Sequence, residues 1–339
     1  MTTLQPPLID VHTHVVPEHF PAYLGAHANA PWPSMAAAQA CHRHVMVSGA
    51  VYRTVSHHCW DCGVRQGDMD RLGITRQVLS PMPELLSYWL APEDGAALCS
   101  YLNEVVAAMV AEAPTRFCGL GAVPLQDVSL AIDALDVAVH QLGLTGVEIA
   151  TNVNGVVIGD PRFQPFFEAA ADWGAAIFVH PLRPTGMDRL VGPATLEQVL
   201  AFPGEVGLAG ASLITGGLLD KLPALRIALS HGGGSLSMLL PRLQHAWQHL
   251  PMVRKELSGD PMAAARRLFV DDLVYDADTI HRLIQVFGDR QVLVGSDYPF
   301  IIQDADPAGR LQSLGLPPTL AQQLRAGNAE RWLGLAPTS

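Results

Sequence analysis

Residues 8–15 have the sequence LIDVHTHV, a nearly continuous apolar run that ends in two histidines separated by one residue. Seven further short apolar runs follow along the chain. They are RQVLSPM at 76–82, FCGLGAVP at 117–124, GVEIAT at 146–151, AAIFVHP at 175–181, RIALSHGG at 226–233, LFVDDLVYD at 268–276 and QVLVGSDYP at 291–299. Runs of this length that lack polar alternation indicate strands buried on both faces of a sheet.

Segments with helical periodicity lie between these runs, for example residues 91–114 and 127–143. In the second segment Asp127 is suited to be the N-cap and Gly143 to end the helix. Strands that alternate with helices predict a parallel sheet. Eight units favour a closed barrel over an open doubly wound sheet, and no G-x-G-x-x-G fingerprint follows the first run. We therefore expect an α/β fold, a distorted (β/α)₈ TIM barrel.

The 339 residues are enough for one such barrel with insertions. Residues 16–60 do not fit the alternation, because they are rich in Pro, Ala and His and contain the β-prone patch HVMVSGAVYRTV at 44–55. We expect a single domain over residues 1–339, with an insertion at about 16–60 that forms a small hairpin over the barrel mouth.

The composition excludes several classes of protein. There are 21 basic and 32 acidic residues, a net charge of −11, which argues against a nucleic-acid surface. No stretch approaches the ~18 consecutive apolar residues of a membrane span, and the opening MTTLQPPLIDVHTH lacks the pattern of a signal peptide. Five scattered cysteines fit reduced thiols. These features predict a cytoplasmic protein with no nucleic-acid or membrane partner.

Four histidines and one aspartate lie at the ends of predicted strands. They are His12, His14, His180, His231 and Asp297. In a (β/α)₈ barrel the carboxyl ends of all strands meet at one mouth, so these five side chains are expected to converge. Imidazole and carboxylate ligands suit a divalent ion such as Zn²⁺. The sequence therefore predicts one divalent metal ion, with zinc the expected metal.

A family resemblance rests on several motifs in order along the chain. DVHTH, FVHP, SHGGGS and GSDYPF resemble the amidohydrolase superfamily. The segments HGGGSLSMLLPRLQHAW at 231–247 and GNAERWL at 327–333 resemble its branch of 2-amino-3-carboxymuconate-6-semialdehyde decarboxylases. The resemblance implies a metal-dependent, non-oxidative decarboxylase that acts on an aromatic or muconate-semialdehyde-like carboxylic acid.

The resemblance also implies roles for individual residues. It makes His231 and Asp297 catalytic, with His231 as the proton-transferring group, and Arg53 a residue that binds the substrate carboxylate. Arg242 matches a second substrate arginine that reaches the active site of the neighbouring subunit, which implies a homodimer. The metal ligands would be His12, His14, His180 and Asp297. The chain departs from the branch at Leu182, where the branch has Trp, and at Leu250, where it has Arg.

Other functions remain open at this point. A mononuclear hydrolase or hydratase would use the same metal, ligands and base, and a non-catalytic metal-binding barrel would keep the ligands without turnover. Two-metal members of the superfamily often use a carbamylated lysine on the fourth strand, but the lysines here are Lys221 and Lys255. Glu148 lies on the predicted fourth strand and is the alternative ligand for a second metal.

Overall fold

The computed structural model describes residues 6–27, 29–193, 195–257 and 259–336. The two ends of the predicted domain, and with them the first five residues of the segment compared with a signal peptide, lie outside the described residues. Within the described part, no helix is both long enough and apolar enough to cross a membrane.

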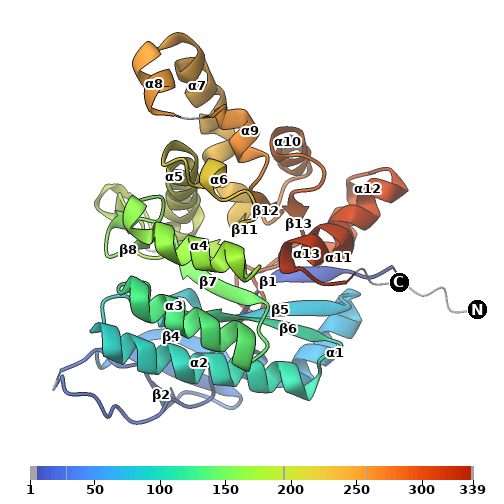
Figure 1. Cartoon of the computed structure of the whole chain (residues 1–339). Helices are drawn as coiled ribbons and strands as arrows, with labels where there is room; N and C mark the ends of the chain where they lie inside the picture. Colours follow the sequence, from blue (N-terminus) through green and yellow to red (C-terminus); the bar gives the residue numbers. More distant parts are fainter. Residues whose placement is uncertain (1–5, 28, 194, 258, 337–339) are drawn as a thin grey trace, which may run out of the picture.

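Eight parallel strands form the central sheet, one from each predicted run (Figure 1). In sheet order they are β1 (Ile9–Val15), β5 (Arg76–Pro81), β6 (Phe117–Ala122), β7 (Gly146–Ala150), β10 (Ala176–His180), β11 (Arg226–Leu229), β12 (Phe269–Asp271) and β13 (Val292–Leu293). The order along the sheet is the order along the chain, as a (β/α)₈ barrel requires. The predicted fold class is confirmed.

The barrel closes between its first and last strands through a short seam. β13 has two residues, and isolated bridges join Asp10 to Val294 and Thr13 to Tyr298. The backbone amides of Val11 and His14 donate to the carbonyls of Val294 and Tyr298 at 2.8 and 2.7 Å. Asp10 strengthens the seam because its carboxylate accepts hydrogen bonds from both the amide and the hydroxyl of Ser296.

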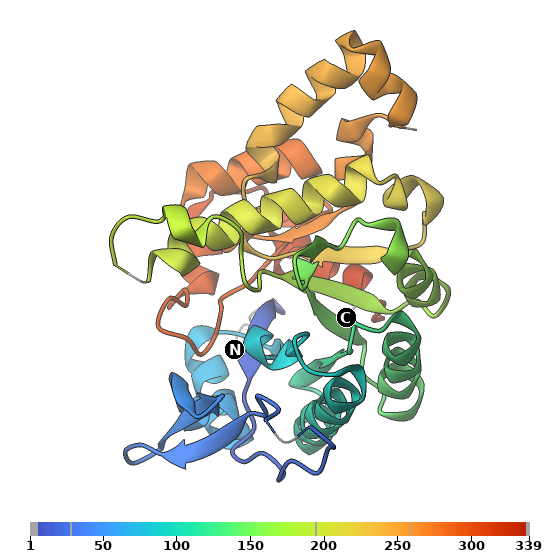
Figure 2. The same cartoon turned by 90° about the vertical axis from the view of Figure 1, so that its left-hand side faces the viewer.

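Helices surround the barrel, and two of them form an arm that projects from it (Figures 1 and 2). The predicted cap Asp127 accepts a hydrogen bond from the amide of Leu130 and begins its helix. The helices are α1 (Cys62–Leu72), α2 (Pro92–Glu112), α3 (Val128–Asp136), α4 (Gln164–Asp172), α5 (Phe202–Thr215), α6 (Leu218–Lys221), α7 (Leu236–His249), α8 (Pro251–Glu256), α9 (Pro261–Ala265), α10 (Ala277–Phe287), α11 (Pro307–Ser313), α12 (Pro318–Gln322) and α13 (Asn328–Leu333). The arm consists of α7 and α8.

A β-bulge in β1 changes which side chains face the barrel interior. The pairing of β1 with β5 shifts between Asp10 and Thr13, where the bulged strand has one residue more than its partner. The bulge consists of Val11 and His12, which together oppose Val78. Val11 belongs to the apolar cluster that includes Phe178 and Trp332, and His12 packs edge-on against Phe178 at 5.0 Å. The extra residue therefore lets neighbouring positions of one strand both point inward.

The segment after β1 forms a three-stranded antiparallel sheet rather than the expected hairpin. Its strands are β2 (Ser34–Ala37), β3 (His42–Val47) and β4 (Ala50–Ser56). The predicted patch at 44–55 covers most of β3 and β4, whereas the short, alanine-containing β2 carried no strand signal. This small sheet lies at one side of the barrel in Figure 2. A two-stranded ribbon of β8 (Asn152–Val153) and β9 (Val156–Val157) completes the strands.

Two predicted strands end earlier than expected, so two of the five predicted site residues lie in turns. β11 ends at Leu229, and His231 follows in a short 3₁₀ turn with φ of 52°. β13 ends at Leu293, and Asp297 has φ of 64°. Such left-handed conformations are uncommon for residues other than glycine and cannot continue a strand.

Candidate metal centre and substrate cavity

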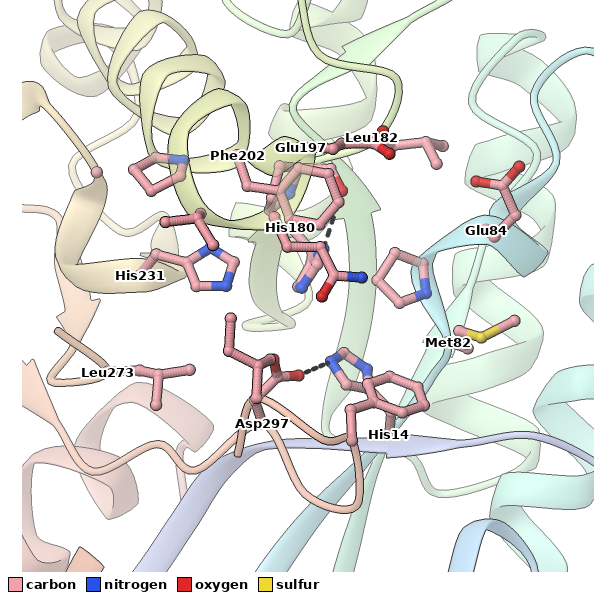
Figure 3. A pocket seen from close by; sticks show the side chains of 18 of the residues that line it. His14, Met82, Glu84, His180, Leu182, Glu197, Phe202, His231, Leu273 and Asp297 are labelled. Atoms are coloured by element: carbon pink, nitrogen blue, oxygen red, sulfur yellow. Dashed lines mark hydrogen bonds and ion pairs between the residues drawn. The ribbon is translucent and has the colours of Figure 1, made fainter. Parts of the chain in front are cut away.

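The carboxyl ends of two strands and the loop after the last strand bring four potential ligands together. His12 and His14 come from β1, His180 is the last residue of β10, and Asp297 follows β13. One ligand atom from each lies within 4.8 Å of the others, and all four residues are buried. Figure 3 shows His14 and Asp297 facing each other, with a separation of 3.1 Å between His14 Nε2 and Asp297 Oδ1.

Hydrogen bonds on the outer side of two rings orient them toward the centre of the group. His12 Nδ1 is 2.7 Å from Asp271 Oδ2, and His180 Nδ1 is 2.9 Å from the carbonyl oxygen of Pro181. In both rings Nε2 is the nitrogen that remains for a ligand. A carboxylate or carbonyl behind a histidine is the usual outer-shell arrangement of a metal-binding imidazole.

The electrostatics of the group favour a cation. Burial opposes protonation of His12, but the hydrogen bond with Asp271 and the charge of Asp297 raise its pKa to about 9. Burial and the neighbouring histidines hold the pKa of His180 well below its ordinary value. Burial also raises the pKa of the Glu148 carboxyl to about 8. A positive charge among these groups would compensate the buried carboxylates.

The donor atoms fit a single divalent ion. Buried polar atoms normally have hydrogen-bond partners, yet His12 Nε2, His14 Nε2 and Asp297 Oδ1 make no hydrogen bond of acceptable geometry with the described residues, although the last two atoms lie 3.1 Å apart. Nitrogen and oxygen ligands from three histidines and one carboxylate match those of zinc and similar transition metals. The group can therefore hold one metal ion.

His231 lies against the same group from the other side of the cavity floor. Its ring centroid is 5.3 Å from that of His12 and 5.2 Å from that of His180. Ser230 Oγ is 3.1 Å from His231 Nδ1, which leaves Nε2 for a reacting group. Burial lowers the pKa of His231 to about 4. The ring is therefore neutral near pH 7 and able to accept a proton.

Asp271 connects His12 with the turn that carries His231, and sequence reasoning did not single it out. One oxygen of its carboxylate is bound to His12, and the other accepts from the amides of Gly232 and Leu273 at 2.8 and 3.2 Å. The predicted run LFVDDLVYD contains this residue, but the adjacent Asp272 gives the same local signal. Asp272 instead pairs with Arg310 at 2.6 Å.

A cavity of about 320 Å³ opens above these residues. His14, His180, His231 and Asp297 contribute to its floor, and much of its wall is apolar (Figure 3). The wall residues include Met82, Leu182, Phe202, Leu273 and Phe300. Its volume lies within the range of small-molecule sites, and its flat aromatic and aliphatic surfaces suit an unsaturated or aromatic ring.

The structure places Arg53 at this cavity. Arg53 belongs to β4 of the small sheet, and its guanidinium carbon is 4.4 Å from the centroid of the Phe300 ring. Phe300 in turn stacks on His14 at 5.0 Å. The arginine therefore lies one aromatic ring away from the potential ligands and lines the same cavity.

The cavity wall carries three charged residues that were not predicted from the sequence, Glu84, Arg183 and Glu197, and the first two lie close together. Glu84 follows β5 in a 3₁₀ turn (Pro83–Leu86), and Arg183 follows β10. Their side chains are 3.8 Å apart, between Glu84 Oε1 and Arg183 Nη2. Burial raises the pKa of the Glu84 carboxyl, whereas Arg183 and Arg53 act in the opposite direction. Both residues lie in loops that carry no motif.

The structure of one chain does not bring Arg242 to the cavity. Arg242 lies on α7, in the projecting arm, and is exposed. It is absent from the described residues that line the cavity. Exposed apolar side chains surround it on the same helix, since Met238 is 73% and Leu239 is 45% exposed.

Nothing in the described residues completes a second metal site. Glu148 is fully buried in β7 and its carboxylate oxygens have no hydrogen-bond partner there, but it is outside the group of four ligands. Lys221 lies on α6 and donates to Gln164, and Lys255 lies on α8. Neither lysine comes from a barrel strand.

The chain is similar to a known family over nearly its whole length. The model of a family described as amidohydrolase matches residues 9–335. The chain is 34% identical to a 2-amino-3-carboxymuconate-6-semialdehyde decarboxylase of Dictyostelium discoideum, over 97% of this chain and 92% of that protein.

Two solved structures extend the comparison. The fold superposes with a TM-score of 0.82 on an IDCase of Metarhizium anisopliae in apo form, at 21% identity and with 98% of each chain covered. It is also similar, with a TM-score of 0.74 and 25% identity over 82% of each chain, to a 5-carboxyvanillate decarboxylase of Novosphingobium aromaticivorans in complex with manganese and 4-hydroxy-3-methoxy-5-nitrobenzoic acid.

Proposed function

The chain belongs to the amidohydrolase family, and on this premise we propose that it is a metal-dependent, non-oxidative decarboxylase of an aromatic or muconate-semialdehyde-like carboxylic acid. One observation carries the proposal. A buried set of three histidines and one aspartate lies at the floor of a ring-sized cavity, with His231 beside it and Arg53 above it. His12, His14, His180 and Asp297 hold the ion in this proposal.

The metal ligands, Arg53, His231 and the apolar walls each have a role in the loss of CO₂. The bond between the ring carbon and the carboxylate breaks, its electron pair stays on that carbon, and a proton replaces the lost group. Bound metal supplies a positive charge that stabilises negative charge on the substrate. Arg53 holds an anionic group of the substrate through charge-assisted hydrogen bonds. His231 first takes up a proton at Nε2 from a solvent water molecule and then delivers it to that carbon, and the apolar walls keep other water away from the carbanion.

The proposal is tested by direct measurement of CO₂. The metal-loaded protein is incubated with a panel of ortho-substituted aromatic and unsaturated carboxylic acids that carry ¹³C in the carboxyl group, and released ¹³CO₂ is measured. We expect release from at least one acid by the wild-type protein. Protein stripped of metal should release none. A matched control is His281→Asn, which changes an exposed histidine of α10.

The same experiment separates decarboxylation from the alternative reactions. A hydrolase or hydratase with this cavity would convert ester, amide or unsaturated analogues by adding water and would leave the carboxyl carbon in the product. If such a product accumulates and no ¹³CO₂ appears, the decarboxylase assignment is wrong. If the metal-loaded protein converts nothing, the non-catalytic barrel is the better description.

The working unit in this proposal is a homodimer in which α7 meets the partner. The arm of α7 and α8 projects from the barrel, and its exposed Met238 and Leu239 are typical of a buried interface. Arg242 lies on the same helix and does not line the cavity of its own chain. We propose that it enters the partner's cavity, where it binds the substrate together with Arg53.

Shared sites are tested by complementation. Homodimers of Arg53→Ala and of Arg242→Ala should each be inactive. Mixing them under subunit exchange builds one site with both arginines and one with neither, so activity should return. The control is each variant treated alone under the same conditions of subunit exchange. If heterodimers form and stay inactive, Arg242 does not act in the partner's site.

The metal and the compartment complete the proposal. We propose zinc, because imidazole and carboxylate ligands without a thiolate suit this ion, and because zinc favours four-coordinate sites. Metal analysis of protein purified without added metal tests this assignment, with manganese as the competing result. We propose a cytoplasmic location, which fractionation of the source cells tests.

A further inference from the structure

Arg65 of α1 is a completely buried cation that the proposed reaction does not use. Its guanidinium group donates hydrogen bonds to four oxygen atoms. They are the carbonyl oxygens of His14 and His58 and the side-chain oxygens of Thr13 and Gln77. A buried charge is costly to keep, and none of these acceptors is a carboxylate that would offset the cost. The presence of an arginine here is therefore explained by the neutral oxygens that it binds.

The oxygens that Arg65 binds lie on both sides of the β-bulge in β1. Gln77 of β5 pairs with Asp10, the last register position before the bulge, and Thr13 is the first position after it. Nη1 of Arg65 is 3.1 Å from Gln77 Oε1 and 3.4 Å from Thr13 Oγ1. Nη2 donates to the carbonyl oxygen of His14, the next residue along β1. One guanidinium group therefore connects the two sides of the bulge.

The bulge determines where the imidazoles of His12 and His14 lie. A bulge interrupts the backbone pairing of two strands and changes the direction of the side chains beside it. Here it includes His12 itself and ends one residue before Thr13, so the ladder alone holds this part of β1 less firmly than the rest. A guanidinium group supplies its donors in a fixed plane, which a lysine ammonium does not. Arg65 can therefore keep the bulge in one conformation.

Two further contacts fix the orientation of Arg65. Its Nε donates to the carbonyl oxygen of His58 at 2.9 Å, in the 3₁₀ turn (His57–Cys59) directly after β4. Its guanidinium carbon is 4.8 Å from the centroid of the Tyr298 ring, in the loop after β13. The hydroxyl of Tyr298 donates in turn to Asp68 of α1 at 2.8 Å. The guanidinium group is therefore held on several sides and can act as a rigid support for β1.

We propose that Arg65 is a positioning residue of the metal centre, which fixes the bulge of β1 and thereby holds the imidazoles of His12 and His14 at the separation that one ion requires. The proposal rests on the metal binding of the proposed function, and it concerns the geometry of the ligands, not the reacting atoms. Without the guanidinium donors, both histidines remain but the contacts across the bulge are lost. The site should then bind an ion more weakly and with a different geometry.

Metal binding by the folded protein tests this role without turnover. Arg65→Lys keeps the charge but cannot supply the planar set of donors. We expect its dissociation constant for Zn²⁺, measured by competition with a chromophoric chelator, to rise about 10–100-fold, the usual effect of losing a group that orients a metal ligand. The visible spectrum of the Co²⁺-loaded variant should also differ from that of the wild-type protein, because it depends on ligand geometry. Both are measured below the unfolding temperature of the variant.

A second variant tests the contact across the bulge from its other end. Gln77→Met approximately keeps the size of the side chain and removes the acceptor on β5, so the dissociation constant for Zn²⁺ should rise about 3-fold or more. The double variant should lose no more affinity than Arg65→Lys alone, because both substitutions remove the same contact. Arg116→Lys is the matched control. Arg116 donates to the carbonyl oxygen of Thr75 at 3.1 Å and to Asp70 at 2.8 Å, and it does not line the cavity.

The results distinguish positioning from a purely structural role. If Arg65 only stabilises the fold, Arg65→Lys lowers the melting temperature while the Zn²⁺ affinity and the Co²⁺ spectrum of the folded protein stay at their wild-type values. That result would overturn the proposal, as would additive losses in the double variant or an equal loss in Arg116→Lys. If Arg65→Lys does not fold, Gln77→Met decides the matter, and wild-type affinity in that variant contradicts the proposal.

The same measurements keep this proposal distinct from the decarboxylase assignment. If the variants lose affinity as expected but no acid releases CO₂ with the wild-type protein, the role of Arg65 stands and the decarboxylase assignment fails. If CO₂ is released and the variants bind Zn²⁺ as the wild-type protein does, the opposite holds. A wild-type protein that binds neither Zn²⁺ nor Co²⁺ would overturn both.

Discussion

The floor and the rim of the cavity differ in how their residues are positioned. The floor consists of His14, His180, His231 and Asp297, and the rim includes Tyr52, Arg53, Glu84 and Arg183. On the floor, His14, His180 and Asp297 are 0, 4 and 6% exposed and come from the barrel strands and the loop at its seam. On the rim, Tyr52 is 42% exposed and the side chain of Arg183 is 55% exposed. Rim residues belong to the small sheet of β2–β4 and to loops. The floor is part of the barrel, whereas the rim is attached to it.

This difference separates the residues expected to bind metal and perform the chemistry from the residues expected to bind the substrate. Floor residues have partners on neighbouring strands, so a substitution there changes the metal centre and the barrel together. Rim residues are more exposed and lie outside the barrel strands, so we expect that they can change without disturbing those strands. We therefore expect floor variants to lose reaction rate or metal, and rim variants to lose substrate affinity. The following predictions test this division, beginning with the largest effect.

Removal of a ligand from the floor should have the largest effect. His180→Ala should contain metal well below one equivalent per chain and lose more activity than the other variants, because three ligands remain for the ion. Elemental analysis and CO₂ release measure the two effects. His281→Ala is the matched control on the surface. Full metal occupancy in His180→Ala would remove His180 from the metal centre.

Removal of the proton-transferring group should leave the metal in place. His231→Asn should keep about one equivalent of metal and lose kcat by about 10²–10⁴-fold, the usual contribution of a general acid or base. Steady-state kinetics with the best acid of the panel measures this loss. A kcat close to that of the wild-type protein would contradict the assignment of His231.

A residue behind the floor should affect metal affinity more than chemistry. Asp271→Asn keeps the size of the side chain but removes the charge behind His12, so metal affinity should fall by about 10–100-fold. Titration with a metal-chelating indicator measures the affinity, and kcat at saturating metal should change less than the affinity. Asp278→Asn, at the exposed start of α10, is the control. Unchanged affinity would assign Asp271 a structural role only.

The smallest effect is expected on the rim. Arg53→Lys keeps the charge but loses the planar donor pair and its stacking on Phe300, so KM for the acid should rise by about 10-fold with a smaller change in kcat. Kinetics against acid concentration measures both constants, with Arg189→Lys as the control. A loss confined to kcat, with KM unchanged, would place Arg53 in the chemistry of the floor and break the division.

The sequence predicts the barrel and the floor well because both depend on local patterns. The eight runs have the apolar composition of buried strands, and the parallel arrangement brings their carboxyl ends together. Histidines at those ends are therefore close in space, irrespective of the conformation of the loops. The exact ends of β11 and β13 were not predictable, since the left-handed conformations of His231 and Asp297 depend on their surroundings and leave no signal in residue type.

The residues of the rim and those behind the floor were harder to predict from the sequence. Glu84 and Arg183 lie in irregular loops, whose paths follow from tertiary contacts such as the hydrogen bond between Asn152 and the Leu182 carbonyl. Asp271 and Asp272 are neighbours in the sequence, and only the pleat and the end of β12 decide which one faces His12. Arg242 needs a second chain to have a role, which the sequence of one chain indicates only through resemblance.

A metal ion bound beside the seam would also stabilise the closed form of the barrel. β1, with His12 and His14, lies on one side of the seam, and the loop with Asp297 lies on the other. An ion bound by all three residues would join the two edges of the barrel, which few backbone hydrogen bonds connect. Opening the barrel would then require release of the ion, so a bound metal would add its binding free energy to the free energy of opening. Amide hydrogens of Val11 and His14, which cross the seam, should therefore exchange with solvent more slowly in metal-loaded protein than in stripped protein.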